Sequence, residues 1–92
     1  MKIKKIVQGA KILKSLGNSK RLEIVYNLRK KEKRVSELEK IMKISQSALS
    51  QHLAILRATG IVSTRRSAQS IYYSLADDKC YKILNLIDEI YD

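Results

Sequence analysis

Apolar residues recur every three or four positions in the first third of the chain, which predicts two helices. The first is amphipathic and ends near Gly17. The second runs from Ser19 to about Lys31, with Asn18 as its N-cap. The basic run that follows, residues 29–34, is expected to be a solvated loop. The apolar stripe of the first helix consists of Ile3, Ile6, Val7, Ala10, Leu13 and Leu16.

A pair of short helices follows in the middle of the chain. Ser36 and Glu39 have the spacing of a capping box, which predicts the start of a third helix. A turn of about three residues leads to a fourth helix, which begins at the capping Ser45 and stops at Gly60. Its apolar face carries Leu49, Leu53 and Leu56. Two short helices joined in this way, the second with a polar exposed face, are typical of a helix-turn-helix.

The last third predicts a hairpin and a final helix. Strands are expected at residues 61–66 and 71–75, around a polar turn at 67–70. Asp77 or Asp78 then caps a helix that reaches Asp92. Its apolar positions alternate three and four apart, as in a coiled-coil seam: Cys80, Ile83, Leu84, Ile87, Ile90 and Tyr91. A single terminal helix has little of its own domain against which to bury such a stripe, so we expect the stripe to pack against a partner subunit.

Together these elements predict a mainly α-helical fold with a small β-wing. Residues 1–92 are expected to form a single winged helix-turn-helix domain in the order ααααββα, whose last helix packs together with the first helix against a partner subunit. The expected dimer interface contains Ile3, Ile6, Val7, Ala10, Ile83, Leu84, Ile87, Ile90 and Tyr91.

The charge of the chain points to a polyanion as partner. Lys and Arg number 19 against 9 Asp and Glu, a formal charge of +10. Nucleic acid is the first candidate and an anionic membrane surface the second. Residues 77–92 depart from this balance, with five acidic and two basic residues. No apolar run approaches the roughly 18 residues needed to span a bilayer, so we expect a cytoplasmic protein.

The candidate DNA-binding residues fall in three groups. The polar face of the fourth helix carries short hydrogen-bonding side chains suited to reading base edges. Lys20 and Arg21 lie in the first turn of the second helix, where cations oppose the helix dipole and indicate a bound phosphate. The hairpin adds Arg65 and Arg66, two adjacent guanidiniums that a purely structural hairpin does not favour. The full set is Lys20, Arg21, Gln46, Ser47, Ser50, Gln51, His52, Arg65, Arg66 and Gln69.

Four side chains leave alternatives open. His52 either contacts DNA or fixes its helix against a neighbour. Tyr72 and Tyr73 alternate on a strand, so one packs inward and the other faces solvent or DNA. Cys80 is either a buried structural thiol or a redox-active thiol whose pKa is lowered near a helix N-terminus.

The same residues argue against metal binding and catalysis. One cysteine excludes an internal disulfide framework and a multi-cysteine metal cage within one chain, and one histidine cannot make a metal site. There is no glycine-rich phosphate loop and no nucleophile paired with a base. We therefore expect no enzyme, no metal and no cofactor.

The segment from Ser45 to Arg66, closed by Ile71-Tyr-Tyr-Ser-Leu75, resembles the ArsR/SmtB family of small dimeric winged-helix repressors. Residues 16–25 resemble the family's entry into the second helix. The resemblance implies a recognition helix that carries Ser47, Ser50, Gln51 and His52 into the major groove. It also implies that Arg65, Arg66 and Gln69 on the wing reach the minor groove or the backbone.

The sensing sites of the family are not matched. Val35-Ser36-Glu37 replaces the Cys-x-Cys of metal-sensing members. Asp78-Lys79-Cys80 keeps only a trace of the zinc site of the last helices, and Tyr91 and Asp92 offer no second pair of ligands. The chain is similar to the branch of thiol-sensing haemolysin and biofilm regulators, but Tyr26 and about Asp92 stand where that branch has its cysteine pair.

Two functions follow from these observations. The first is a homodimeric repressor that occludes a palindromic operator, with an unknown small-molecule or redox effector or none. The alternative is an accessory winged-helix protein that packages DNA or binds a partner with little sequence preference, driven by charge.

Overall fold

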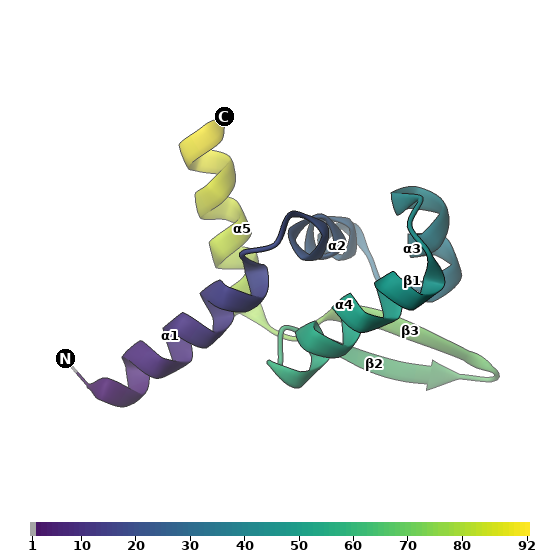
Figure 1. Ribbon diagram of the computed structural model, residues 1–92, viewed down its shortest axis with the longest axis horizontal. Coiled ribbons are helices and arrows are strands. Elements are labelled where there is room, and N and C mark those ends of the chain that lie inside the picture. Colours follow the sequence, from purple (N-terminus) through teal and green to yellow (C-terminus); the bar gives the residue numbers. More distant parts are fainter. Residues whose placement is uncertain (1) are drawn as a thin grey trace.

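The computed structural model describes residues 2–92 and contains five helices and three strands in that range (Figure 1). The molecule measures 45 × 29 × 21 Å. The elements are α1 (Ile3–Leu16), α2 (Ser19–Lys30), β1 (Lys33–Arg34), α3 (Val35–Met42), α4 (Gln46–Ala58), β2 (Val62–Ser67), β3 (Ser70–Leu75) and α5 (Asp78–Tyr91). The predicted helices and hairpin are confirmed, and β1 is an element that the sequence analysis missed.

The core lies where α2, α3, α4 and the start of α5 meet. Its fully buried side chains are mostly leucines, the largest being Ile24, Leu28, Leu38, Leu49, Leu53, Leu56 and Leu84. The three leucines predicted on the apolar face of α4 are all among them. One face of α4 is therefore fixed against the body, and the opposite face remains at the surface.

The caps predicted for three helices are confirmed. Asn18 Oδ1 accepts hydrogen bonds from the backbone N–H groups of Lys20 and Arg21, at 3.0 and 3.1 Å. Ser45 Oγ accepts from the N–H of Ala48 at 3.1 Å, and Asp77 caps α5 through Lys79. Each oxygen satisfies a donor that a helix N-terminus leaves without an intrahelical partner.

The capping box predicted at Ser36 and Glu39 is wrong. The N-cap of α3 lies two residues earlier, at Arg34, so the helix begins at Val35, and it is Glu37 whose carboxylate accepts from the backbone N–H of Arg34 at 3.0 Å. The helix starts early because Arg34 is already held in β1, so the chain passes directly from strand to helix. Ser36 consequently lies inside the first turn of α3.

The solvated loop predicted at residues 29–34 is also wrong. Its first two residues belong to α2, and its last two form β1, which pairs antiparallel with β3. The sheet has the order β1-β3-β2, and the element order is ααβααββα. Lys33 is buried, and its Nζ donates to the carbonyls of Asn27 and Lys31 at 3.1 and 3.4 Å. A cation there satisfies carbonyls left open at the C-terminal end of α2.

The hairpin is tighter than predicted. Ser67 pairs with Ser70, so the turn contains two residues, Ala68 and Gln69, rather than four. Ala68 has a φ of 55°, in the left-handed region that such turns require and that glycine adopts most easily. The turn is held in this conformation by the ladder of six residue pairs between β2 and β3.

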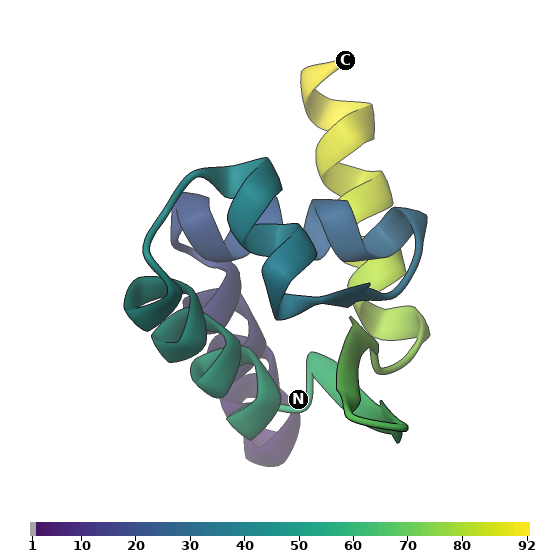
Figure 2. The same cartoon turned by 90° about the vertical axis from the view of Figure 1, so that its right-hand side faces the viewer.

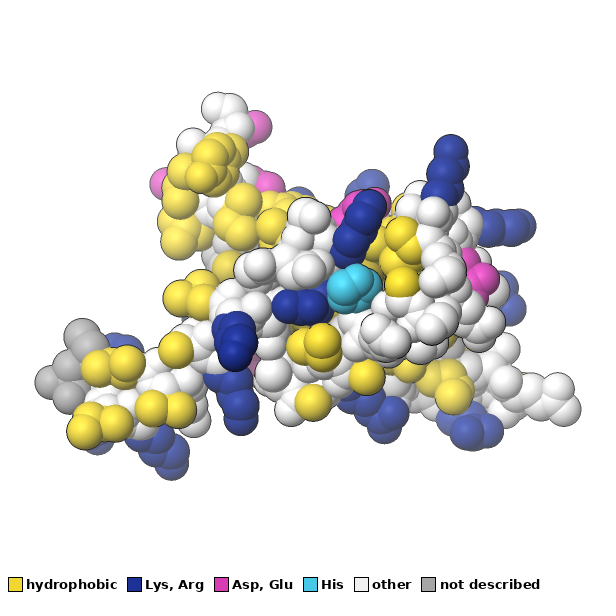
Figure 3. All heavy atoms as spheres, viewed as in Figure 1, with side chains coloured by type: hydrophobic (Ala, Val, Ile, Leu, Met, Phe, Trp, Pro, Cys, Tyr) yellow, Lys and Arg dark blue, Asp and Glu magenta, His cyan; other side chains and the backbone are white. Residues whose placement is uncertain are grey.

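α1 and α5 extend away from the body, on the side opposite to the hairpin tip (Figure 1). Seen from another side, α5 rises alone above the helices that surround the core (Figure 2). The apolar side chains of α1 and α5 gather on the surface of these two helices (Figure 3). The most exposed are Ile3, Val7, Leu13, Ile90 and Tyr91, at 59–83%. None of the helices within residues 2–92 is long and apolar enough to cross a membrane.

We expect Lys33→Ala to lower the free energy of unfolding by about 1–3 kcal/mol, because two partly buried carbonyl groups lose a charged donor. Lys31→Ala is the matched control, since it removes the same charge from an exposed side chain. It should stay within about 0.5 kcal/mol of the wild type. Urea unfolding followed by circular dichroism measures both, and equal effects would show that Lys33 contributes only charge.

Candidate nucleic-acid interface

The exposed face of α4 presents short polar side chains on a rigid helix. Leu49, Leu53 and Leu56 anchor the opposite face in the core. The exposed positions of this face are Gln46, Ser47, Ser50, Gln51, Ala54 and Arg57, and the helix also exposes Ile55 and Ala58. Serine and alanine occupy the middle of this face, so the helix backbone can approach the floor of a groove closely. Longer side chains flank it, which leaves hydrogen-bonding groups at the edges.

Ala54 and Arg57 extend this face beyond the residues selected from the sequence. They follow Ser47 and Ser50 at the three-and-four spacing of one helix face, a signal that was present in the sequence. Arg57 also lines a shallow groove of about 340 Å³ together with Ser50 of α4 and Tyr73 of β3. The candidate interface therefore continues toward the C-terminal end of α4.

His52 does not lie in the middle of the exposed face. It follows the buried Leu49 by three residues and precedes the buried Leu56 by four, so it stands on the flank of α4 next to the core. Its side chain is half-buried, and its Nδ1 is buried without a hydrogen-bond partner among residues 2–92. This position suits packing against a neighbouring element better than reading a base.

The N-terminus of α2 is largely occupied by the protein itself. Asn18 already uses the N–H groups of Lys20 and Arg21. The Nε of Arg21 donates to the carbonyl of Ser15 at 2.6 Å, which ties α2 to the end of α1. Only Lys20 of this pair has a fully exposed side chain. The arrangement leaves Lys20 as the cation available to a phosphate.

The two arginines of the wing have different surroundings. Arg65 forms a bidentate ion pair with Glu32, and its guanidinium lies 4.5 Å from the centre of the Tyr72 ring. The hydrogen bond from Arg65 is the main reason why the pKa of Glu32 lies below its usual range. Arg66 and Gln69 are exposed near the hairpin tip, and Arg66 makes no ion pair within residues 2–92. Arg65 thus braces the wing, while Arg66 is free to meet a ligand.

The register of the sheet explains this division. Arg34, Tyr72 and Arg65 are cross-strand neighbours and share one face of the sheet. Lys33, Tyr73 and Thr64 share the other face, where Tyr73 packs against the core. Tyr73 is therefore the inward tyrosine, and Tyr72 is the outward one that meets Arg65. Figure 2 shows α4 at the lower left of the molecule and the hairpin at the lower right, with a space between the two ribbons.

Cys80 faces the interior. Burial raises the pKa of its thiol to about 11, and the nearby Asp77 carboxylate adds to the shift. The helix N-terminus beside it does not compensate for this desolvation. Within residues 2–92 no group of three or more His, Cys, Asp or Glu side chains is arranged to hold a metal ion.

Comparison with known proteins relates this fold to bacterial regulators. The profile described as "Bacterial regulatory protein, arsR family" matches residues 18–64. The nodulation protein NolR of Rhizobium meliloti is 50% identical over 83 residues, which cover 90% of this chain and 68% of NolR. Other matches include a biofilm growth-associated repressor.

Solved structures agree over nearly the whole chain. HlyU from Vibrio cholerae superposes with a TM-score of 0.91 at 38% identity, covering 98% of both chains. A homodimeric winged helix-turn-helix DNA-binding domain from Mycobacterium bovis superposes with a TM-score of 0.86 at 26% identity, covering 95% of this chain and 81% of that domain. The similarity thus includes α1 and α5 as well as the helix-turn-helix.

We expect iodoacetamide to alkylate Cys80 about 100-fold more slowly in the folded protein than in urea at the same neutral pH. A pKa of about 11 reduces the reactive thiolate by roughly that factor relative to an ordinary thiol. Mass spectrometry of timed samples measures both rates. Equal rates would mean that Cys80 is accessible with an ordinary thiol pKa, and a faster rate in the folded protein would mean an activated thiol, as a redox sensor requires.

We expect Arg65→Ala to lower the midpoint of thermal unfolding and Arg66→Ala to leave it unchanged, because only Arg65 has partners within the fold. Glu32→Gln should lower the midpoint in the same direction. The double variant Glu32→Gln/Arg65→Ala should add little to either single change, since both remove one contact. Circular dichroism follows the transition. Strictly additive effects of the two substitutions would contradict a stabilising ion pair between Arg65 and Glu32.

Proposed function

Because the chain belongs to the arsR family of bacterial regulatory proteins, we propose that it regulates transcription as a homodimer that binds a two-fold symmetric DNA site. In this proposal α4 is the recognition helix and the β2–β3 hairpin is the wing. Each protomer reads one half-site, and the half-sites lie about 34–36 Å apart or at a multiple of that spacing. The bound dimer represses by occluding the promoter.

The observation that carries the proposal is the exposed face of α4. A major groove admits one helix, and Gln side chains at its edge can bond adenine through two hydrogen bonds. We assign base contacts to Gln46, Ser47, Ser50 and Gln51. Arg57, at the far end of the same face, contacts the phosphate backbone. His52 positions the helix from its half-buried flank.

The wing and the start of α2 supply contacts that carry no sequence information. We assign phosphate or minor-groove contacts to Lys20, Arg66 and Gln69, which are exposed. Arg21 and Arg65 are positioning residues in this proposal, because each already has a partner in the fold. The formal charge of +10 strengthens all DNA binding and makes it dependent on salt.

The apolar surfaces of α1 and α5 form the proposed dimer interface. Ile3, Ile6, Val7, Ala10, Ile90 and Tyr91 are exposed in one chain, and Ile83 and Ile87 are half-buried. Exposed apolar side chains gathered in this number on two helices of a small domain are typical of a surface that a partner covers. Leu84 is already buried in its own protomer, so it supports the interface from behind. The homodimeric domain from Mycobacterium bovis supports this assignment.

The proposed place of action is the cytoplasm, where bacterial DNA lies. A redox role for Cys80 is not part of the proposal, because a buried thiol with a pKa of about 11 is a poor nucleophile. The alternative function, low-specificity DNA packaging, rests on the charge alone. It predicts that the affinity for DNA falls as the salt concentration rises and does not depend on the DNA sequence.

Selection of bound sequences from a random duplex pool separates the two functions. At near-physiological salt with competitor DNA, we expect enrichment of a two-fold symmetric motif. The absence of an enriched motif, with affinity that collapses as salt rises, would favour packaging.

On the selected site, we expect Gln51→Ala to lose about 1–3 kcal/mol of discrimination against random DNA, because it removes a base contact. Arg66→Ala should weaken both DNAs equally and reduce the salt slope by about one. Gln8→Ala, the same substitution as at Gln51 but on α1, is the control. Fluorescence anisotropy measures the affinities. Equal losses on both DNAs for Gln51→Ala would remove its base-reading role.

A further inference from the structure

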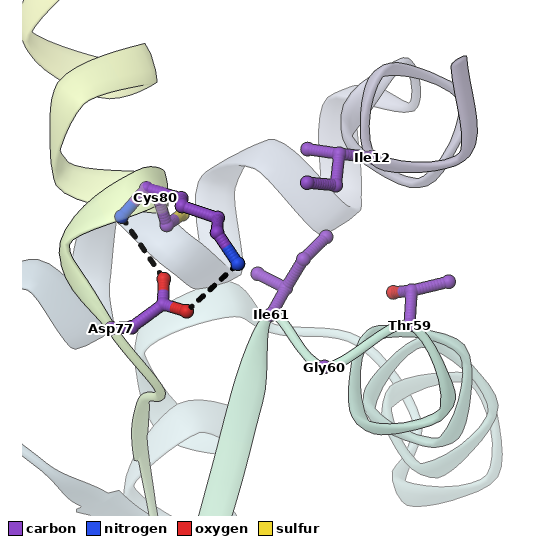
Figure 4. A pocket seen from close by; sticks show the side chains of 7 residues that line it. Ile12, Thr59, Gly60, Ile61, Asp77 and Cys80 are labelled. Carbon is purple, nitrogen blue, oxygen red and sulfur yellow. Dashed lines mark hydrogen bonds and ion pairs between the residues drawn. The ribbon is translucent and has the colours of Figure 1, made fainter. Parts of the chain in front are cut away.

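A hollow of about 560 Å³ lies beneath the inner face of α1, between that helix, the C-terminal end of α4 and the first turn of α5. It continues into a cavity of about 40 Å³, onto which Ile12, Ile61 and Cys80 converge (Figure 4). The two spaces share Ile12, Thr59 and Lys79 in their walls. The volume of the hollow is within the usual range for a small-molecule site, about 300–1,000 Å³.

The rim of the hollow is cationic, and its apolar floor consists of Ile12 together with Ile61 and Cys80 of the adjoining cavity. Lys5, Lys11 and Lys79 line it, and no acidic residue does. Asp77, at the edge of the smaller cavity, pairs with Lys79 at 3.5 Å (Figure 4). Lys5 and Lys11 have no ion pair within residues 2–92. Positive charge around an apolar floor complements an organic anion with an apolar body.

Gly9 gives a second, independent indication. It lies in the middle of α1 and lines the hollow, and a Cβ added there would meet no atom within 4 Å. A glycine inside a helix costs about 0.5–1 kcal/mol relative to alanine. Neither a turn nor a close neighbour within the chain requires it. The bare backbone instead widens the hollow and lets a ligand lie against the helix.

The lysines of the hollow are not part of the proposed DNA-reading surface. The hollow reaches the end of α4 at Thr59, whereas the base-reading residues end at Gln51. Eight residues of helix place these two positions about 12 Å apart. The hollow touches α1 and α5, the proposed dimer helices, and the end of α4, the proposed recognition helix.

We propose that this hollow binds a small organic anion with an apolar body, and that the ligand controls DNA binding. The regulatory part rests on the proposed function. A ligand held between the dimer helices and the end of α4 fits one arrangement of these helices better than another. It therefore shifts the protein between its DNA-binding and non-binding states.

The first experiment measures binding without DNA, so that it is independent of the proposed function. Titration calorimetry compares decanoate with decanol, which lacks the charge, and with inorganic phosphate, which lacks the apolar body. We expect decanoate alone to bind. Equal binding of decanoate and decanol would mean adsorption to the exposed apolar stripes, and it would overturn the proposal, as would no binding of decanoate.

Matched variants locate the site. Lys11→Gln should weaken decanoate about fivefold, as expected for one partly exposed ion pair. Lys14→Gln, on the same helix but outside the hollow, should not weaken it. Gly9→Leu should abolish binding by filling the space, and Gly9→Ala should retain it, while both raise helicity in circular dichroism. Unchanged binding by Lys11→Gln and Gly9→Leu would place the ligand elsewhere.

The second experiment measures affinity for the selected DNA with and without saturating decanoate. We expect a change of about 5- to 150-fold, the usual range of coupling between two sites. The change should disappear in Gly9→Leu and persist in Gly9→Ala. Decanoate binding without any change in DNA affinity would overturn the regulatory role. Failure to select any DNA motif would overturn the proposed function. The calorimetry would still test whether the hollow binds decanoate, because it contains no DNA.

Discussion

The burial of one leucine face of α4 is the constraint on which the rest of the structure depends. Leu49, Leu53 and Leu56 are at most 1% exposed, so this helix can neither rotate nor slide without opening the core. Fixing one face determines which side chains point outward. A surface that reads DNA must hold its hydrogen-bonding groups in a constant position, and here the hydrophobic core supplies that rigidity.

A polar network connects this core to the projecting α5. The hydroxyl of Tyr26 donates to Asp88 at 2.9 Å, and Arg29 pairs with the same carboxylate at 2.7 Å. The Arg29 guanidinium also lies 4.8 Å from the centre of the Tyr26 ring. The hydrogen bonds from Arg29 and Tyr26 hold the pKa of Asp88 below its usual range. α5 is thereby oriented by α2, which also packs against α4, so the proposed dimer and DNA surfaces share one support.

The basic residues divide into those that serve the fold and those that face outward. Lys33 closes the end of α2, Arg21 joins α2 to α1, Arg29 holds α5, and Arg65 braces the wing. All four satisfy carbonyl or carboxylate oxygens of the chain. The cations left over are at the surface, where they add to a general positive field. A net charge alone therefore overstates how many cations can meet DNA.

The sequence by itself determined the five helices, the hairpin and the polar face of α4, because these follow from local periodicity and local caps such as Asn18 and Ser45. Tertiary structure decided what depends on contacts between distant residues. Two residues are too few to show a strand pattern, so β1 became visible only through its pairing with β3. The partner of Arg65 is 33 residues away, and the burial of Lys33 and of the Nδ1 atom of His52 depends on elements that fold around them. Periodicity describes one element at a time, whereas a side chain's role is set by its neighbours.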